Sequence, residues 1–164
     1  MPNAIRIYLD TNIFIYAIER PAGVSGEIAD LLLDLIGIEP STIDSEIVTS
    51  ELFLAEVLVA PLATNDEDLI MKYEAIQTQE FNVDVKRIDL DILRIAARIR
   101  SKNTSIKLPD AIHIATAAFS RCTHFLTADR DLVKQSKKLE LEFAVCEPDA
   151  KLLAELLKVL FEND

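Results

Sequence analysis

Acidic side chains occur at four places in this sequence where an α/β fold would bring them to one edge of a sheet. Asp10 follows a short apolar run, and Glu56 lies in an apolar helical segment. Asp110 lies in the first turn of another apolar helix, and Asp129 and Asp131 follow a later apolar run. Each acid alone has an ordinary interpretation as a helix cap or a solvated residue. Carboxylates that converge repel one another, so together they point to a cation.

Glu56 strengthens the case for a cation. It is flanked by Ala55 and Val57 in a helix that is apolar on most sides, so an inward Glu56 would be costly without a metal or a partner. Glu51 is five residues earlier, about 500° around the helix, and points away. Oxygen ligands without a Cys cluster favour Mg²⁺ or Mn²⁺ over Zn²⁺. These ions activate water for in-line displacement at phosphorus.

The elements that must position these acids alternate between strand and helix. We expect short strands at Ile5–Leu9, Ile47–Val48, Val83–Ile88, His124–Thr127 and Leu141–Val145. The segments between them have the apolar spacing and the capping residues of helices. This alternation predicts an α/β fold with a central parallel sheet flanked by helices on both faces, in a single domain over residues 1–164.

Capping residues and breakers locate the helix ends. Ser25, Asp89 and Asp149 each precede a helical pattern, and Pro109 suits a first turn. The first helix is expected to be capped by Thr11 or Asn12. A later helix is expected to start at Thr49 or Ser50 and to stop near Pro61. Two more helices are expected to be capped by Thr64 or Asn65 and by Asp129.

A C-terminal helical extension is expected over residues 149–162. It carries one apolar stripe formed by Leu152, Leu153, Leu156, Val159 and Leu160. Such a stripe must be covered. Packing against the chain's own domain is the preferred interpretation, and a homodimer interface is the alternative.

Composition and charge limit the other classes of function. The net charge is −11, yet 12 of the 17 basic residues lie in 86–138. From charge alone, solvated helix faces are slightly preferred over local phosphate binding for this segment. Because Lys107 and Arg130 are nearest the acids, they are the residues expected to hold RNA phosphates. No apolar segment reaches the ~20 residues needed to cross a bilayer. The start lacks a signal-peptide pattern, and the two Cys are isolated. We therefore expect a cytoplasmic protein without a membrane partner.

Four sequence blocks contain the acids and their neighbours: Tyr8–Asn12, Thr49–Leu58, Leu108–Ala117 and Leu126–Leu132. In order and spacing, these blocks together resemble the PIN-domain ribonucleases, with the closest similarity to VapC-type toxins of toxin–antitoxin pairs. The resemblance implies a PIN-like fold and an endoribonuclease that hydrolyses RNA phosphodiester bonds with a water activated by Mg²⁺ or Mn²⁺. It also implies frequent homodimers and an antitoxin partner.

By position in these blocks, the resemblance implies site residues. Asp10, Glu56, Asp110 and Asp129 match the family's acidic quartet, which binds the metal and is catalytic; Asn12 and Thr127 match the polar residues beside it. Asp131 is an alternative to Asp129 as the fourth acid.

Single residues argue against two other classes of function. A phosphatase with Asp10 as nucleophile needs a second acid two residues later, where this sequence has Asn12. A phosphoacceptor receiver domain needs paired acids before the aspartate strand, and residues 4–6 contain none. A PIN-like module that binds RNA or protein without cleavage remains the alternative. His113 shares a helix face with Asp110; it either touches RNA, orients a carboxylate or, as we prefer, is a hydrogen-bonded packing residue.

Overall fold

The structure, a computed structural model, describes residues 5–37, 47–78 and 80–162. Five strands in these residues form one parallel sheet in the order β3-β2-β1-β4-β5. Because the strands are parallel, their carboxyl ends share one edge of the sheet. The predicted α/β fold with a parallel sheet is therefore confirmed. The strands are β1 (Ile7–Leu9), β2 (Ile47–Ser50), β3 (Val83–Lys86), β4 (His124–Leu126) and β5 (Ala144–Cys146).

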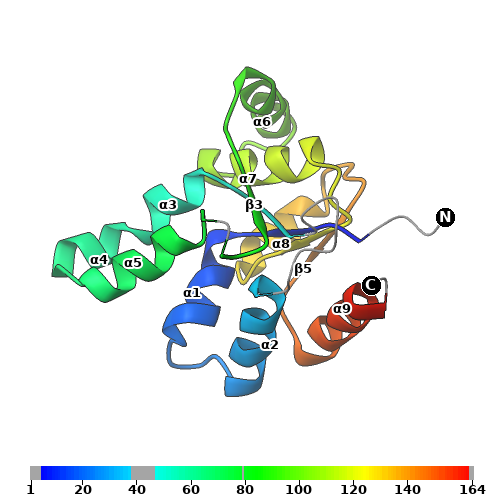
Figure 1. Ribbon diagram of the computed structural model, residues 1–164. Helices are drawn as coiled ribbons and strands as arrows, with labels where there is room; N and C mark the ends of the chain where they lie inside the picture. Colours follow the sequence, from blue (N-terminus) through cyan, green and yellow to red (C-terminus); the bar gives the residue numbers. More distant parts are fainter. Residues whose placement is uncertain (1–4, 38–46, 79, 163–164) are drawn as a thin grey trace.

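Helices connect the strands and cover both faces of the sheet (Figure 1). Within the described residues they are α1 (Thr11–Glu19), α2 (Gly26–Ile36), α3 (Leu52–Val57), α4 (Val59–Thr64), α5 (Glu67–Ala75), α6 (Leu90–Lys102), α7 (Leu108–Phe119), α8 (Arg130–Ser136) and α9 (Ala150–Glu162).

The sheet separates two apolar cores, because successive side chains of a strand point to opposite faces. In β1, Ile7 and Leu9 belong to the core shared with α1, α2 and α9. Tyr8, between them, belongs to the core shared with α6, α7 and α8. Figure 1 shows α6 and α7 on one side of the sheet and α1, α2 and α9 on the other. Helix α7 is buried from Ala111 to Ala117, as its small apolar composition predicts, and exposed at both ends.

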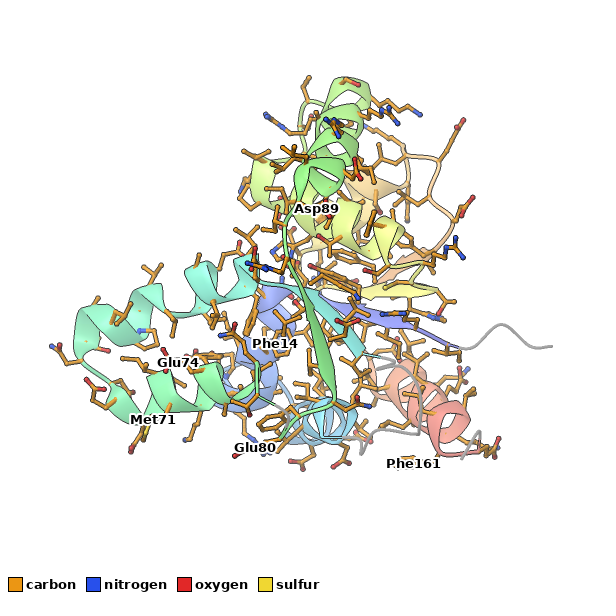
Figure 2. All side chains as sticks on the ribbon, turned by 45° about the horizontal axis from the view of Figure 1, so that its top comes forward. Phe14, Met71, Glu74, Glu80, Asp89 and Phe161 are labelled. Carbon is orange, nitrogen blue, oxygen red and sulfur yellow. The ribbon has the colours of Figure 1, made fainter. Side chains whose placement is uncertain are left out.

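Helices α4 and α5 form an arm that projects from the body of the fold, with Met71 and Glu74 on it and Phe14 inside the body (Figure 2). Helix α4 follows α3 directly, so the prediction that the helix stops near Pro61 was wrong. Pro61 is the third residue of α4. Its missing N–H therefore falls among the first-turn amides, which have no intrahelical acceptor.

Several helix boundaries differ from the predictions because the expected capping residues belong to other elements. Thr49 and Ser50 belong to β2 instead of starting a helix, and the Thr49 hydroxyl donates to the Leu9 carbonyl at 2.9 Å. Asp66 caps α5 in place of Thr64 or Asn65, since Asn65 is left-handed and ends α4.

Strand β5 is shorter than predicted and shifted toward the C-terminus. It covers Ala144–Cys146, whereas the sequence pattern predicted Leu141–Val145. Leu141 and Phe143 instead pack against the core on the α6–α7 side. These apolar residues are therefore partly buried although they lie outside the strand.

The C-terminal helix α9 packs on its own chain. Leu153, Leu156, Leu157 and Leu160 are buried in the same core as α2, and Asp149 caps the helix through the Leu152 amide at 2.9 Å. Packing against the chain's own domain, the preferred interpretation, is confirmed for Leu153, Leu156 and Leu160, whereas Leu152 and Val159 of the predicted stripe are only partly buried. The alternative, a homodimer interface, stays a prediction. Phe161, at the far end of α9, is 59% exposed (Figure 2).

No helix in the described ranges is long and apolar enough to cross a bilayer. Residues 1–4, which belong to the start that lacks a signal-peptide pattern, lie outside the described residues.

Candidate active site

Asp10 lies at the carboxyl end of the central strand and is the N-cap of α1, where Thr11 or Asn12 was expected. Its Oδ1 accepts a hydrogen bond from the Thr11 amide at 2.8 Å, and its Oδ2 accepts from the Thr127 hydroxyl at 2.7 Å and the Asn12 amide group at 3.3 Å. The residue is 5% exposed. Hydrogen-bond donors that converge on both oxygens fix the orientation of this buried carboxylate.

Asn12 and Thr127 join the end of β1 to the end of β4. The Asn12 Oδ1 accepts from the Ala128 amide at 2.9 Å, and its Nδ2 donates to the Thr127 hydroxyl oxygen at 3.2 Å. The two polar residues expected beside Asp10 therefore contact it directly. The parallel pairing of β1 with β4 makes this possible, because residues 117 positions apart reach the same edge.

Asp129 caps α8, as its ordinary interpretation predicted. Its Oδ1 accepts from the amides of Asp131 and Leu132 at 2.9 and 3.0 Å, and its own amide donates to the Thr127 hydroxyl oxygen at 3.0 Å. The cap therefore fixes Asp129 next to the Asp10–Thr127 pair. Asp131 lies in the first turn of α8.

Asp110 lies in the first turn of α7, partly buried. Burial raises the pKa of its carboxyl group to about 6, with further increases from the charges of Asp10 and Asp129 that His113 and Lys107 only partly offset. Asp10 and Asp129, the N-cap of α8, are thus each close enough to Asp110 to disfavour its negative charge.

Glu56 is held by a buried histidine. His113 Nε2 lies 2.7 Å from Glu56 Oε2, and the Thr11 hydroxyl donates to the same oxygen at 2.5 Å. His113 Nδ1 lies 2.7 Å from the hydroxyl of Tyr8, and Nε2 lies 3.7 Å from Asp10 Oδ1. An inward Glu56 on an apolar helix was expected to need a partner, and His113 is that partner. Glu51 points away and accepts a hydrogen bond from the Ile88 amide.

The charges of this pair reinforce each other. Burial alone raises the pKa of Glu56, but hydrogen bonds from His113 and Thr11 outweigh it, so the net shift is downward. Burial alone lowers the pKa of His113, but the hydrogen bond to Glu56 and the charges of Asp10, Glu56 and Asp110 outweigh it, so the net shift is upward. Burial also raises the pKa of Tyr8, which keeps its hydroxyl protonated. The pair is therefore an imidazolium–carboxylate ion pair over a widened pH range.

His113 and Thr11 are the residues that sequence reasoning undervalued. The spacing of His113 from Asp110 indicated a shared helix face. The preferred interpretation of His113 as a hydrogen-bonded packing residue is confirmed. Its side chain is 1% exposed and also bonds to the Glu56 carboxylate. Its contact with Glu56, 57 residues away, had no local signal in the sequence.

The two basic residues proposed to contact RNA differ in their surroundings. Lys107 immediately precedes α7 and its charge acts on Asp110. Arg130 is paired with Glu147 at 2.8 Å on an exposed surface. The pairing neutralises part of the charge that Arg130 would offer to a phosphate, so Lys107 is the better placed of the two.

The donor set suits a hard divalent cation, since carboxylate oxygens are the ligands that Mg²⁺ and Mn²⁺ prefer. In the described part of the chain, no three Asp, Glu, His or Cys side chains are already gathered as a ready ligand set. The carboxylates instead take nearby hydroxyl, amide and imidazole donors. The raised pKa of Asp110 between Asp10 and Asp129 is the electrostatic cost that a bound cation would remove.

Comparisons with known proteins identify a family and a fold. A family model described as the PIN domain matches residues 7–138. A toxin–antitoxin complex from Klebsiella pneumoniae is 22% identical with a TM-score of 0.60, covering 87% of this chain and 98% of that one. FitAcB from Neisseria gonorrhoeae is 22% identical with a TM-score of 0.61, covering 87% and 97%. DNA-bound VapBC from Salmonella typhimurium is 16% identical with a TM-score of 0.62, covering 88% and 99%. No curated protein sequence matches. At these identities, the solved structures show the fold alone.

Proposed function

The chain belongs to the PIN-domain family, and from that premise we propose that it is a metal-dependent endoribonuclease, the toxin of a toxin–antitoxin pair. The observation that carries the proposal is the acidic group at the carboxyl edge of the sheet. Burial and the charges of Asp10 and Asp129 raise the pKa of Asp110 to about 6. Such a group is costly as a purely structural feature and useful as a cation site.

Asp10, Asp110 and Asp129 would hold Mg²⁺ or Mn²⁺, with Glu56 as the fourth acid. The ion, when bound, supplies water activation and charge stabilisation for displacement at phosphorus. The chain's own groups prepare the site. Asn12 and Thr127 hold Asp10 with both oxygens oriented.

Two further groups serve the substrate. Glu56 is kept ionised by its ion pair with His113, so it can accept a hydrogen bond from water. Lys107 supplies a positive charge at the start of α7, where a phosphate of the RNA would approach Asp110.

Cleavage of a labelled single-stranded RNA with Mg²⁺ or Mn²⁺ tests the reaction. We expect product with wild type, none with EDTA, and a loss of about 100-fold or more with Asp10→Asn, as for removal of one preorganised charge. Glu51→Gln is the matched control, because Glu51 lies near Glu56 in sequence but bonds to the Ile88 amide instead. A metal-dependent RNA affinity without any cleavage would support the non-cleaving PIN-like module instead.

Calorimetric titration with Mn²⁺ tests the metal site independently of activity. We expect weaker binding by Asp10→Asn and by Asp110→Asn than by wild type, since each change removes an oxygen charge from the proposed ligand set. The same Mn²⁺ affinity in all three proteins would refute this assignment.

The partner proposal rests on the fold and on its similarity to the toxin–antitoxin complex from Klebsiella pneumoniae. We propose an antitoxin protein as the partner of this chain, with a homodimer as its own assembly, in the cytoplasm, where the free thiols Cys122 and Cys146 are stable. Co-purification with the product of an adjacent small reading frame, and light scattering of the purified chain, test these proposals. A monomer that no adjacent gene product inhibits would contradict them.

A further inference from the structure

Glu56 differs from the other three acids in how the fold holds it. Asp10 and Asp129 are helix N-caps bonded to backbone amides, and Asp110 lies in the first turn of the long helix α7. Glu56 lies near the end of α3, a helix of 6 residues whose N-cap makes no side-chain hydrogen bond. Its longer side chain also has more rotamers to lose. The orientation of its carboxylate must therefore come from side chains of other elements.

Those side chains form a chain of hydrogen bonds from the core to the acidic site. Tyr8 is fully buried in the central strand, and its hydroxyl bonds to His113 Nδ1 at 2.7 Å. The opposite ring nitrogen of His113 bonds to Glu56 Oε2 at 2.7 Å. The Tyr8 and His113 rings also meet edge to face, with centroids 5.9 Å apart. Both nitrogens of the imidazole are thus engaged, and the ring has one orientation.

We propose that His113 is a positioning residue, which holds Glu56 toward the acidic site while Tyr8 fixes the ring; this inference rests on the proposed nuclease function. Helix α7 then serves the site twice, with Asp110 as an acid and His113 one turn later as the support of a second acid. Partners that orient an acid in this way commonly change metal affinity or activity by about 10- to 100-fold when they are removed.

Nitrogen-15 NMR of the imidazole rings tests the hydrogen bonds without any metal or RNA. The chain has 2 His, so the tag-free protein shows two ring patterns. His124, at the other end of the sheet, bonds to Thr123 and is an internal control. We expect Glu56→Gln to shift the His113 Nε2 signal, Tyr8→Phe to shift Nδ1, and neither to shift His124. Unshifted His113 signals in both variants would overturn the proposal.

The effect on the site is measured with His113→Leu and His113→Gln, each first checked for folding by circular dichroism. Leucine removes the donor to Glu56, whereas the glutamine amide can replace Nε2–H. We expect His113→Leu to weaken Mn²⁺ binding about 10-fold and to lower kcat with KM for RNA unchanged, and His113→Gln to recover most of both. His124→Gln is the matched control and should behave as wild type.

The outcomes separate this inference from the proposed function. If wild type binds Mn²⁺ and cleaves RNA but His113→Leu does so equally well, the positioning role is wrong and the nuclease assignment stands. If His113→Leu does not fold, Tyr8→Phe decides, because it removes the hydrogen bond that fixes the imidazole ring. We expect Tyr8→Phe to lower Mn²⁺ affinity and kcat, and unchanged values of both in this variant refute the role. A wild-type chain that neither binds Mn²⁺ nor cleaves RNA refutes the function itself.

Discussion

Asp110→Asn should stabilise the metal-free protein at neutral pH. The folded-state pKa of Asp110, about 6, lies above the ordinary value of 3.8, so the charged form is disfavoured by folding. A difference of about two pKa units at ~1.4 kcal/mol each amounts to at most ~3 kcal/mol above pH 6. The change also removes a first-turn carboxylate from α7, which costs ~0.3–1 kcal/mol. Because this residue is partly buried and partly screened, we expect a net gain of ~1–2 kcal/mol.

The sign of the effect depends on pH in a defined way. Between pH 3.8 and 6 the folded state holds the Asp110 proton more tightly than the unfolded state, so wild-type stability falls as pH rises through this window. At pH 5 the loss of stability caused by ionising Asp110 has reached about half of its full value, and it reaches the full value above the folded-state pKa. The advantage of Asp110→Asn should therefore be clearly smaller at pH 5 than at pH 7.5.

Urea unfolding of EDTA-treated protein, followed by circular dichroism because the chain has no Trp, measures this difference. Asp68→Asn is the matched control, since it removes an exposed first-turn carboxylate from α5 and isolates the helix-dipole contribution. Added Mg²⁺ should stabilise wild type more than Asp110→Asn. The reasoning is refuted if Asp110→Asn is less stable than wild type at pH 7.5, or if its advantage is the same at pH 5.

Three further changes probe the rest of the fold and site. Asp10→Ala should lower the unfolding free energy by ~1–2 kcal/mol, because a buried cap loses its acceptor; an unchanged urea midpoint would contradict the cap. Leu153→Ala should cost ~2–5 kcal/mol, whereas Phe161→Ala, at an exposed position of the same helix, should cost little; equal urea midpoints for the two would contradict the packing of α9. Lys107→Ala should weaken RNA binding and flatten its salt dependence more than Arg130→Ala, which is already ion-paired; equal salt slopes in both variants and wild type would show that these charges only face solvent.

The amino-acid sequence by itself determined most elements and the order of the acids along the chain. Ser25, Asp89 and Asp149 cap helices as predicted, because a cap depends on its own side chain and on amides two or three residues away. The apolar stripe of α9 indicated correctly which face needs cover. These features are local, so neighbouring residues contain the information that decides them.

The tertiary structure alone decided which residues meet. Thr49 could start a helix or end a strand, and the Leu9 carbonyl of the neighbouring strand settled it. The sequence left Asp129 and Asp131 as alternatives for the fourth acid. In the folded chain the charge of Asp129 raises the pKa of Asp110, while the choice between the two as a metal ligand stays a prediction.

The contact between His113 and Glu56 joins helices 57 residues apart in sequence. No propensity or spacing encodes it, because it depends on how α3 and α7 pack around the buried hydroxyl of Tyr8. Local rules locate a carboxylate on an element, whereas the partner that orients it is set by the relative placement of elements in the core.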